Sequence, residues 1–397
     1  MHPWQALVQS VAVTLVNLRT LPARLAPSAV AIVGMAGVVG VLVAVLSMAE
    51  GFRATMANTG AEDTVIVMRA GSDSEMTSIL MREDMDIVRD AEEIARTASG
   101  PLASAELFVV IDLIKASTGT VGNAPLRGVD PVAFQVRRVR ITEGRMFVPG
   151  RNEVMVGRAA RNEYRGLGLG SRLRVGQSDW TVVGAFDAGG TVPDSELWCD
   201  GNVLGPLYER GPTRQAVYAK LRSTDAFTAL KDRLTTDPRT KLMVLREREY
   251  YESQSRFVYS MITGLGAIIA LLMGIGAVFA AVNTMYSAVA SRTREIATLR
   301  ALGFGGLPVM LSVLAESMLL ALAGGAIGAA VAWAGFNGYQ AATMNWQSMS
   351  TIAFAFRVTP RLLAQGLAYA LVLGLLGGLL PAIRAARLPV VVALREL

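Results

Sequence analysis

Charged residues are scarce in this chain. They make up 18% of its 397 residues, whereas residues of the AVILMFWYC set make up 52% and the mean hydropathy is +0.41. Soluble domains carry about a quarter charged residues, so the shortage must be concentrated in part of the chain. Residues 25–49, 257–291 and 362–383 contain no charge at all. This distribution excludes a purely soluble protein.

Histidine, cysteine and lysine are also nearly absent, which excludes several kinds of site. His2 is the one histidine and Cys199 the one cysteine. The chain therefore cannot build a Ser-His-Asp triad, a histidine-rich metal site, an intramolecular disulfide or a CxxC pair. A P-loop needs Gly-Lys-Ser/Thr, and none of the four lysines follows a glycine. We expect no catalytic residue, no metal site and no ATP hydrolysis by the Walker mechanism in this chain.

The net charge of +6 is confined to the margins of the apolar segments. Residues 50–256 carry 28 basic and 29 acidic side chains, whereas the rest of the chain carries 10 and 3. A basic excess beside apolar segments indicates membrane topology and argues against nucleic-acid binding. The positive-inside rule places eight arginines and both termini in the cytoplasm, with Arg357 and Arg361 as exceptions. The eight are Arg19, Arg24, Arg292, Arg294, Arg300, Arg384, Arg387 and Arg395.

Four apolar segments are long enough to cross a bilayer, which takes about 20 residues each. The predicted fold is a membrane protein of four transmembrane α-helices, with a large mixed α/β domain inserted between helices 1 and 2. The predicted segments are a cytoplasmic amphipathic N-terminal helix (1–25), the first span (26–49), the outer α/β domain (50–256), the second span with a stalk (257–286), a cytoplasmic coupling helix (287–303), the third span (304–335), an outer loop (336–361), the fourth span (362–382) and a cytoplasmic tail (383–397).

The N-terminal residues allow other interpretations. Residues 1–49 could be a cleaved signal peptide, but their 25-residue apolar run exceeds the usual length of about 7–15 residues. Residues 4–21 fit an interfacial amphipathic helix, and a simple extension of the first span is the alternative.

Alternating and helical patterns divide the outer domain into short elements. The charged helix at its end is expected to run straight into the second span. The predicted strands are Asp63–Met68, Phe108–Ile114, Ala124–Val129, Asn152–Val156, Ala216–Leu221 and Leu242–Leu245, with a hairpin at Leu173–Phe186, and the predicted helices are Met81–Ile94, Gly157–Tyr164, Thr224–Leu234 and Arg246–Phe257.

The segment between the second and third spans combines apolar and charged residues at helical spacing. Ile296, Leu299 and Leu302 recur every three residues, and Gly303 is a plausible helix stop. A short helix of this kind can insert apolar side chains into a groove of a soluble partner, while its charges fix the orientation. A solvated connector that only satisfies topology is the alternative.

These residues resemble a known family. The run SRTREIATLRALGF (291–304), Glu316 and Gly324–Gly328 resemble the permease signature of MacB/FtsX-type ABC transporters. The opening and closing segments and four short outer motifs are similar to the same family. They are NLRT (17–20), PAIRAARLPVVVALR (381–395), GVDP (128–131), GRMF (144–147), NEVMVG (152–157) and TVVG (181–184).

The resemblance implies a permease of the bacterial inner membrane, built as a homodimer or heterodimer. About 25 residues precede the first span, so two copies of a separate ABC ATP-binding subunit would bind ATP and Mg, and this chain would bind no cofactor. The family implies a MacB-like periplasmic core with a porter-like βαβ part and a smaller β-rich part. ATP-driven helix movement would shift this core (mechanotransmission) and drive export, with a periplasmic adaptor as a further partner.

The resemblance also suggests roles for particular residues. Contacts to the ATPase subunit are expected from Arg292, Arg294, Glu295, Ile296, Leu299, Arg300 and Leu302, with Ile296 and Leu299 as buried anchors. Glu316 lies within the third span, where a carboxylate is costly and functional by default, and a snorkelling Glu is the alternative. Gly324 with Gly328 and Gly374 with Gly378 form GxxxG pairs, expected to pack helices within one subunit rather than across a dimer.

Two other functions fit part of the pattern. An FtsX-like protein would relay ATP turnover to a periplasmic partner such as a cell-wall hydrolase, although the outer domain is larger than such a relay needs. A membrane-tethered enzyme would have to work through carboxylates alone, and no suitably spaced pair stands out.

Overall fold

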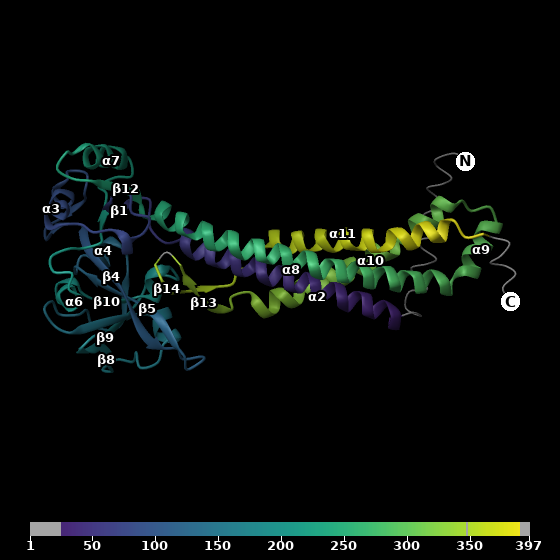
Figure 1. Ribbon diagram of the computed structural model, residues 1–397, viewed down its shortest axis with the longest axis horizontal. Coiled ribbons are helices and arrows are strands. Elements are labelled where there is room, and N and C mark those ends of the chain that lie inside the picture. Colours follow the sequence, from purple (N-terminus) through teal and green to yellow (C-terminus); the bar gives the residue numbers. More distant parts are fainter. Residues whose placement is uncertain (1–24, 347, 390–397) are drawn as a thin grey trace. The chain divides into compact units, whose positions relative to one another are not determined.

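The structure, a computed structural model, describes residues 25–346 and 348–389 (Figure 1). The chain divides into two compact units. The helical unit comprises the chain up to Glu50, Ser260–Tyr339 and the chain from Phe356, and the α/β unit comprises Gly51–Tyr259 and Gln340–Ala355. The predicted N-terminal amphipathic helix and the end of the predicted tail, including Arg395, lie outside the described residues.

Four helices of the described chain are long and apolar enough to cross a membrane. Residues from all four meet in one apolar cluster, which includes Val39, Ala277, Ala321 and Ala370, and Figure 1 shows these helices lying alongside one another. Small residues predominate at the contacts, as expected where backbones approach closely. The helices are α2 (Leu25–Ala57), α8 (Glu247–Ser291), α10 (Gly306–Phe336) and α11 (Pro360–Ala386).

The segment predicted as one coupling helix, 287–303, is divided between two helices. Helix α8 continues through Ser291, and the backbone breaks at Arg292, where φ is −112° and ψ is 12°. Helix α9 (Thr293–Ala301) follows and ends before Gly303, whose φ of +93° only glycine adopts readily. Gly303 is therefore the helix stop that the sequence predicts.

A ten-stranded mixed sheet forms the core of the α/β unit. Its strand order is β12-β1-β11-β4-β5-β10-β7-β9-β6, and β8 pairs with β9. The strands are β1 (Thr64–Arg69), β4 (Ala103–Ile114), β5 (Val121–Val129), β6 (Arg140–Gly144), β7 (Glu153–Gly157), β8 (Arg172–Val175), β9 (Ser178–Asp187), β10 (Leu197–Asp200), β11 (Ala216–Lys220) and β12 (Leu242–Arg246).

The long strand β4 joins two halves of this sheet. Its first residues, Ala103–Glu106, pair with β11, and its remaining residues, Leu107–Ile114, pair with β5. One apolar cluster packs helices α3 and α7 on the β1/β11/β12 half, and another packs α5 and α6 on the other half. The helices are α3 (Arg82–Asp90), α4 (Ala133–Val136), α5 (Arg158–Glu163), α6 (Gly201–Leu207) and α7 (Ala226–Thr236), with the 3-10 turns η2 (Glu75–Thr77) and η3 (Val192–Ser195).

The connection between α10 and α11 differs from the plain loop predicted at 336–361. It forms a hairpin of β13 (Gln340–Asn345) and β14 (Ser350–Ala355), which belongs to the α/β unit. The main-chain N–H of Ala353 donates to Ser195 Oγ at 2.9 Å, and Asn123 Nδ2 donates to the Met349 carbonyl at 3.0 Å. These contacts hold the hairpin against the strands and turns of the α/β unit.

Candidate functional site

The segment Arg292–Leu302, here called the coupling segment, is attached to all three helices that surround it. Ile296 is 6% exposed and packs in an apolar cluster with Met285 and Val289 of α8, Val309 of α10 and Ala385 of α11. Ile296 lies on the apolar face of α9, where residues recur every three or four positions, and this placement explains its burial. The contacts fix α9 within the helical unit.

An ion pair fastens the start of this segment to α10. Arg292 Nη1 donates to Glu316 Oε2 at 2.8 Å, and Nη2 donates to Oε1 at 2.5 Å. Both residues are 4% exposed. Burying two charges is costly unless they pair well, and a bidentate arginine–carboxylate contact is the strongest such pairing. The partner of Glu316, which the sequence did not identify, is thus Arg292.

A second arginine fastens the end of the segment to α11. Arg300 Nη1 donates to the Ala386 carbonyl at 2.5 Å and to the Leu388 carbonyl at 3.4 Å. The last carbonyls of a helix have no partner within the helix and carry partial negative charge, so a cation there is favourable.

The residues predicted to contact an ATPase subunit therefore fall into two groups. Arg292 and Ile296 are buried within the chain, and their contact with an ATPase subunit stays a prediction. Arg294, Glu295 and Leu302 are exposed, and Leu299 and Arg300 are half-buried. Leu302 has 73% of its surface exposed and is the large apolar side chain that the segment leaves uncovered.

The four predicted packing glycines lie at contacts within the helical unit. A Cβ on Gly324 would stand 2.6 Å from the Ile32 carbonyl of α2, and one on Gly328 would meet the backbone of Ala36. A Cβ on Gly378 would stand 2.6 Å from the Ser317 Cβ of α10. Gly374 lies beside the same helix, and its carbonyl accepts a hydrogen bond from Ser317 Oγ at 2.7 Å. Each glycine permits a close helix approach.

The α/β unit contains a group of buried charges centred on Arg127 of β5. Arg127 is 1% exposed and donates five hydrogen bonds to three carboxylates. Two join it to Glu196 at 2.8 Å each, two join it to Glu75 at 2.9 and 3.0 Å, and one joins it to Glu106 at 3.1 Å. All five donors of the guanidinium are therefore used.

Arg137 connects this group to the first turn of α8. Its Nη1 lies 3.3 Å from Glu106 Oε2, its Nε lies 3.3 Å from Glu247 Oε1, and its Nη2 donates to the Tyr251 hydroxyl at 2.8 Å. Glu247 and Tyr251 begin α8. The buried charge cluster, as we name it, consists of Arg127, Arg137, Glu75, Glu106, Glu196 and Glu247.

The cluster holds four carboxylates against two guanidinium groups, so its acids differ in their pKa values. Burial raises the pKa of Glu106 to about 7, opposed by Arg137 and Arg127 and reinforced by Glu75 and Glu196. Burial also acts on Glu196, but Arg127 and Arg137 outweigh it and hold its pKa below the usual value. Glu106 Oε1 has no hydrogen-bond partner among the described residues. A protonated Glu106 would relieve part of the excess negative charge.

The buried charge cluster was not predicted from the sequence, although two charged residues in apolar strand sequences indicate it. Glu106 and Arg127 each stand inside otherwise apolar strand sequences, ASAELFVV and APLRGV. A charge inside a buried strand requires an opposite charge from another element. Besides each other, their partners are Glu75 of η2, Arg137 directly after α4 and Glu196 directly before β10, which only the folded chain brings together.

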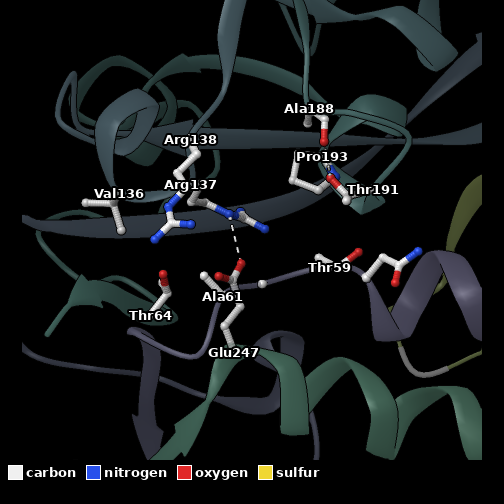
Figure 2. Close-up of a pocket in the computed structure, with 12 residues that line it drawn as sticks. Thr59, Ala61, Thr64, Val136, Arg137, Arg138, Ala188, Thr191, Pro193 and Glu247 are labelled. Carbon is white, nitrogen blue, oxygen red and sulfur yellow. Dashed lines mark hydrogen bonds and ion pairs between the residues drawn. The ribbon is translucent and has the colours of Figure 1, made fainter. Parts of the chain in front are cut away.

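A polar pocket of about 210 Å³ opens beside the cluster. Figure 2 shows the Glu247 carboxylate directed at Arg137 in this pocket, whose lining also includes Thr59 and Ala61 from the turn after α2. A Cβ on Gly60 would stand 2.8 Å from the Arg248 nitrogen, so the turn that follows α2 touches the start of α8 here. The pocket therefore lies between the residues that follow α2 and the start of α8.

The contacts described in these two regions are ion pairs, hydrogen bonds and apolar packing. Among residues 25–346 and 348–389, no group of three or more His, Cys, Asp or Glu could hold a metal ion. Cys199 of β10 is fully buried in the apolar core. Gln254 of α8 accepts a hydrogen bond from Asn345 of the hairpin at 3.0 Å, so α8 contacts the hairpin as well as the sheet.

Comparison with known proteins gives the family. Residues 28–237 match the MacB-like periplasmic core domain, and residues 267–390 match the FtsX-like permease C-terminal domain. The chain belongs to the MacB/FtsX-type permease family of ABC transporters. The core-domain match includes Arg127 and Arg137 of the buried charge cluster, and the FtsX-like match includes Arg292 and Glu316. The chain is thus a multi-pass membrane protein of this family.

Curated relatives are similar over about two thirds of this chain. It is 26% identical over 291 residues to the macrolide export ATP-binding/permease protein MacB of Chromobacterium violaceum, covering 67% of this chain and 42% of that protein. It is 25% identical over 296 residues to a probable export ATP-binding/permease protein of Pseudomonas fluorescens, covering 68% of this chain and 43% of that protein. The chain spans less than half the length of these two relatives.

Among solved structures, the periplasmic region of MacB from Actinobacillus actinomycetemcomitans aligns with a TM-score of 0.38 and 13% identity. The alignment covers 50% of this chain and 94% of that region.

Proposed function

We propose that this chain is the permease subunit of an ABC transporter whose ATP is hydrolysed by a separate subunit bound at the coupling segment. Movement of the membrane helices would shift the α/β unit and drive export or extrusion of a substrate. The permease family supports the transporter assignment, and the direction and mechanism are our inference.

One observation carries the proposal: the coupling segment is attached to three helices while its apolar end is exposed. Arg292 binds Glu316 of α10, Arg300 binds the end of α11, and Ile296 packs against α8. Leu302 and Arg294 remain exposed. A partner bound to these exposed side chains would move α8, α10 and α11 together, because α9 is attached to all three helices.

Helix α8 offers a route from this segment to the α/β unit. It is one helix of 45 residues, or about 68 Å at 1.5 Å per residue. It contains no proline, the commonest cause of a sharp helix kink. Its first residue, Glu247, lies in the buried charge cluster. A displacement along α8 would therefore act on the buried charge cluster.

We also propose how the chain is oriented in the membrane and which subunits it assembles with. Arginines beside the apolar helices favour both termini in the cytoplasm of an inner membrane, with the α/β unit outside. Two copies of an ABC ATP-binding subunit would bind ATP and Mg beneath a homodimer or heterodimer of permeases, surrounded by membrane lipid. A periplasmic adaptor would complete an export system. Export is preferred to an FtsX-like relay because the α/β unit, Gly51–Tyr259 with the hairpin, is large.

Co-purification tests the proposal. The tagged full chain is isolated from its native membranes in mild detergent, and the eluate is assayed for ATP hydrolysis and for subunits with a P-loop. We expect both from the unmodified chain. Leu302→Glu places a charge where an apolar contact is proposed, and we expect it to lower the recovered ATPase at least ten-fold.

Val121→Glu is the matched control, because Val121 is 60% exposed and belongs to the α/β unit. This variant should retain the partner. Recovery of no ATP-hydrolysing subunit with the unmodified chain, or equal recovery with Leu302→Glu, would overturn the proposal.

A further inference from the structure

A second pocket, of about 290 Å³, lies between α3 and α6 of the α/β unit. Its lining includes Arg82 and Arg89 of α3, Asp130 after β5 and Arg214 before β11. The lining therefore contains three arginines and one aspartate, which gives it a net charge of +2. The pocket is separate from the buried charge cluster and shares no residue with it.

Arg214 is the unusual member of this pocket. Four arginines are buried in the described chain: Arg127, Arg137, Arg214 and Arg292. The other three each lie within 3.3 Å of a carboxylate oxygen. Arg214 has no ion pair among the described residues, although it is only 7% exposed. A buried charge without a counter-charge costs several kcal/mol, so this arginine requires an explanation.

The hydrogen bonds of Arg214 position its guanidinium without neutralising it. Nη1 donates to the Thr213 carbonyl at 2.9 Å and to the Gly211 carbonyl at 3.4 Å, and Nη2 donates to Asn202 Oδ1 at 2.8 Å. All three acceptors are neutral, and Nη2 uses one of its two hydrogens. Burial lowers the pKa of Arg214, with Asp130 and Asp200 opposing from beyond ion-pair distance. The guanidinium is held in place with donor capacity unused.

The other two arginines also keep free donors. Arg89 Nη2 donates to Asp130 Oδ2 at 2.6 Å, and the Asp130 carboxylate also accepts from the Ala105 nitrogen at 3.0 Å. This contact uses one nitrogen of the Arg89 guanidinium. Arg82 is exposed and forms no ion pair with the described residues. Guanidinium groups present paired N–H donors that match the oxygens of a phosphate.

We infer that this pocket binds a phosphate dianion, either inorganic phosphate or the phosphate monoester of a larger molecule, through Arg82, Arg89 and Arg214. A dianion matches the net charge of +2, whereas a carboxylate would leave one positive charge uncompensated. The bound group would supply the counter-charge that Arg214 lacks. The inference does not depend on the proposed coupling to an ATPase, because the site lies entirely within the α/β unit.

Calorimetric titration of the purified full chain tests the site. Inorganic phosphate is added at pH 8, with chloride adjusted to constant ionic strength, and glycerol 3-phosphate is used in a second series. We expect saturable binding of inorganic phosphate at one site per chain. Equal or tighter binding of the monoester would indicate that the site holds the end of a larger ligand, and weaker binding would indicate the free ion; either result supports the site.

Variants assign the binding to these arginines. Arg214→Met and Arg82→Gln should each weaken phosphate binding at least ten-fold, whereas Arg174→Gln, an exposed arginine of β8, should leave it unchanged. Arg214→Met should still fold, because it replaces an uncompensated buried charge with an apolar side chain. Arg82→Gln lies on the surface and provides the test even if Arg214→Met does not fold. Absence of saturable binding by both ligands, or unchanged binding in Arg82→Gln, would overturn the inference.

Discussion

Arg292 and Glu316 form a bidentate ion pair between the start of the coupling segment and the third apolar helix, with both residues 4% exposed. The two residues are 24 positions apart in the sequence. Each charge offsets the free-energy cost of burying the other. The ion pair also couples the movement of α9 to that of α10.

Breaking this pair should destabilise the chain strongly. Glu316→Met leaves Arg292 buried without its counter-charge, and Arg292→Met leaves Glu316 in the same state, so each should cost about 3–5 kcal/mol. The double variant Arg292→Met with Glu316→Met removes both charges and should recover most of the loss. Thermal unfolding of the full chain in detergent measures the three variants. Additive losses in the double variant would contradict a direct pairing.

Glu106 should make the stability of the α/β unit depend on pH. Its pKa is about 7 in the folded chain against 4.5 in the unfolded chain, so the folded state binds the proton more tightly between these values. The resulting stabilisation is complete below about pH 4.5 and is lost as the pH rises through about 7. Glu106 faces Arg127, Arg137, Glu75 and Glu196, so the measured midpoint belongs to the group.

Glu106→Gln, which resembles the protonated acid, should flatten this dependence and be at least as stable as the unmodified chain at pH 8. Thermal unfolding at pH 5, 6, 7 and 8 provides the comparison. Glu92→Gln is the control, since the Glu92 side chain is 77% exposed. An equal slope in Glu106→Gln and the unmodified chain would show that another group is responsible.

Gly60 should tolerate no side chain, because α8 lies against it. Gly60→Ala introduces a Cβ 2.8 Å from the Arg248 nitrogen, and its φ is +86°. Gly71→Ala has nearly the same φ of +85° but meets nothing within 4 Å, so it isolates the cost of the backbone conformation, about 1–2 kcal/mol. We expect Gly60→Ala to lower the unfolding temperature clearly more than Gly71→Ala. Equal effects would mean that Gly60 does not touch α8.

Gly324 should be equally restrictive in the helical unit. Gly324→Leu drives a side chain into the backbone of α2, where even a Cβ would stand 2.6 Å from the Ile32 carbonyl. Overpacking of this kind costs about 1–3 kcal/mol or more, and we expect loss of the folded chain in detergent by size-exclusion chromatography. Gly335→Leu on the same helix meets nothing within 4 Å and should elute normally. Normal elution of Gly324→Leu would contradict the close approach of α2 and α10.

Much of the secondary structure follows from local patterns. The four long apolar helices lie where uncharged runs predict them, and predicted strands such as Asp63–Met68 agree with β1 to within one residue. Short elements without a clear period were missed, including β10 and the hairpin of β13 and β14. The hairpin follows a long apolar helix, and its sequence differs little from that of an ordinary connection.

The site residues were harder to predict, because burial was unknown. The spacing of Ile296 correctly indicates an apolar face, but spacing alone does not say whether that face meets a partner or the same chain. In the structure it meets α8, α10 and α11. The buried charge cluster was missed because its members come from strands and helices that are not neighbours in the sequence.

The amino-acid sequence by itself determined which segments are apolar enough to enter a membrane and which form strands, because both properties depend on neighbouring residues. It also contained the residues by which the family is recognised. Only the tertiary structure decided which charges meet. Arg127 and Arg292 acquire carboxylates whereas Arg214 does not, because an ion pair requires two side chains from separate elements to arrive within about 4 Å, a distance set by packing rather than by sequence.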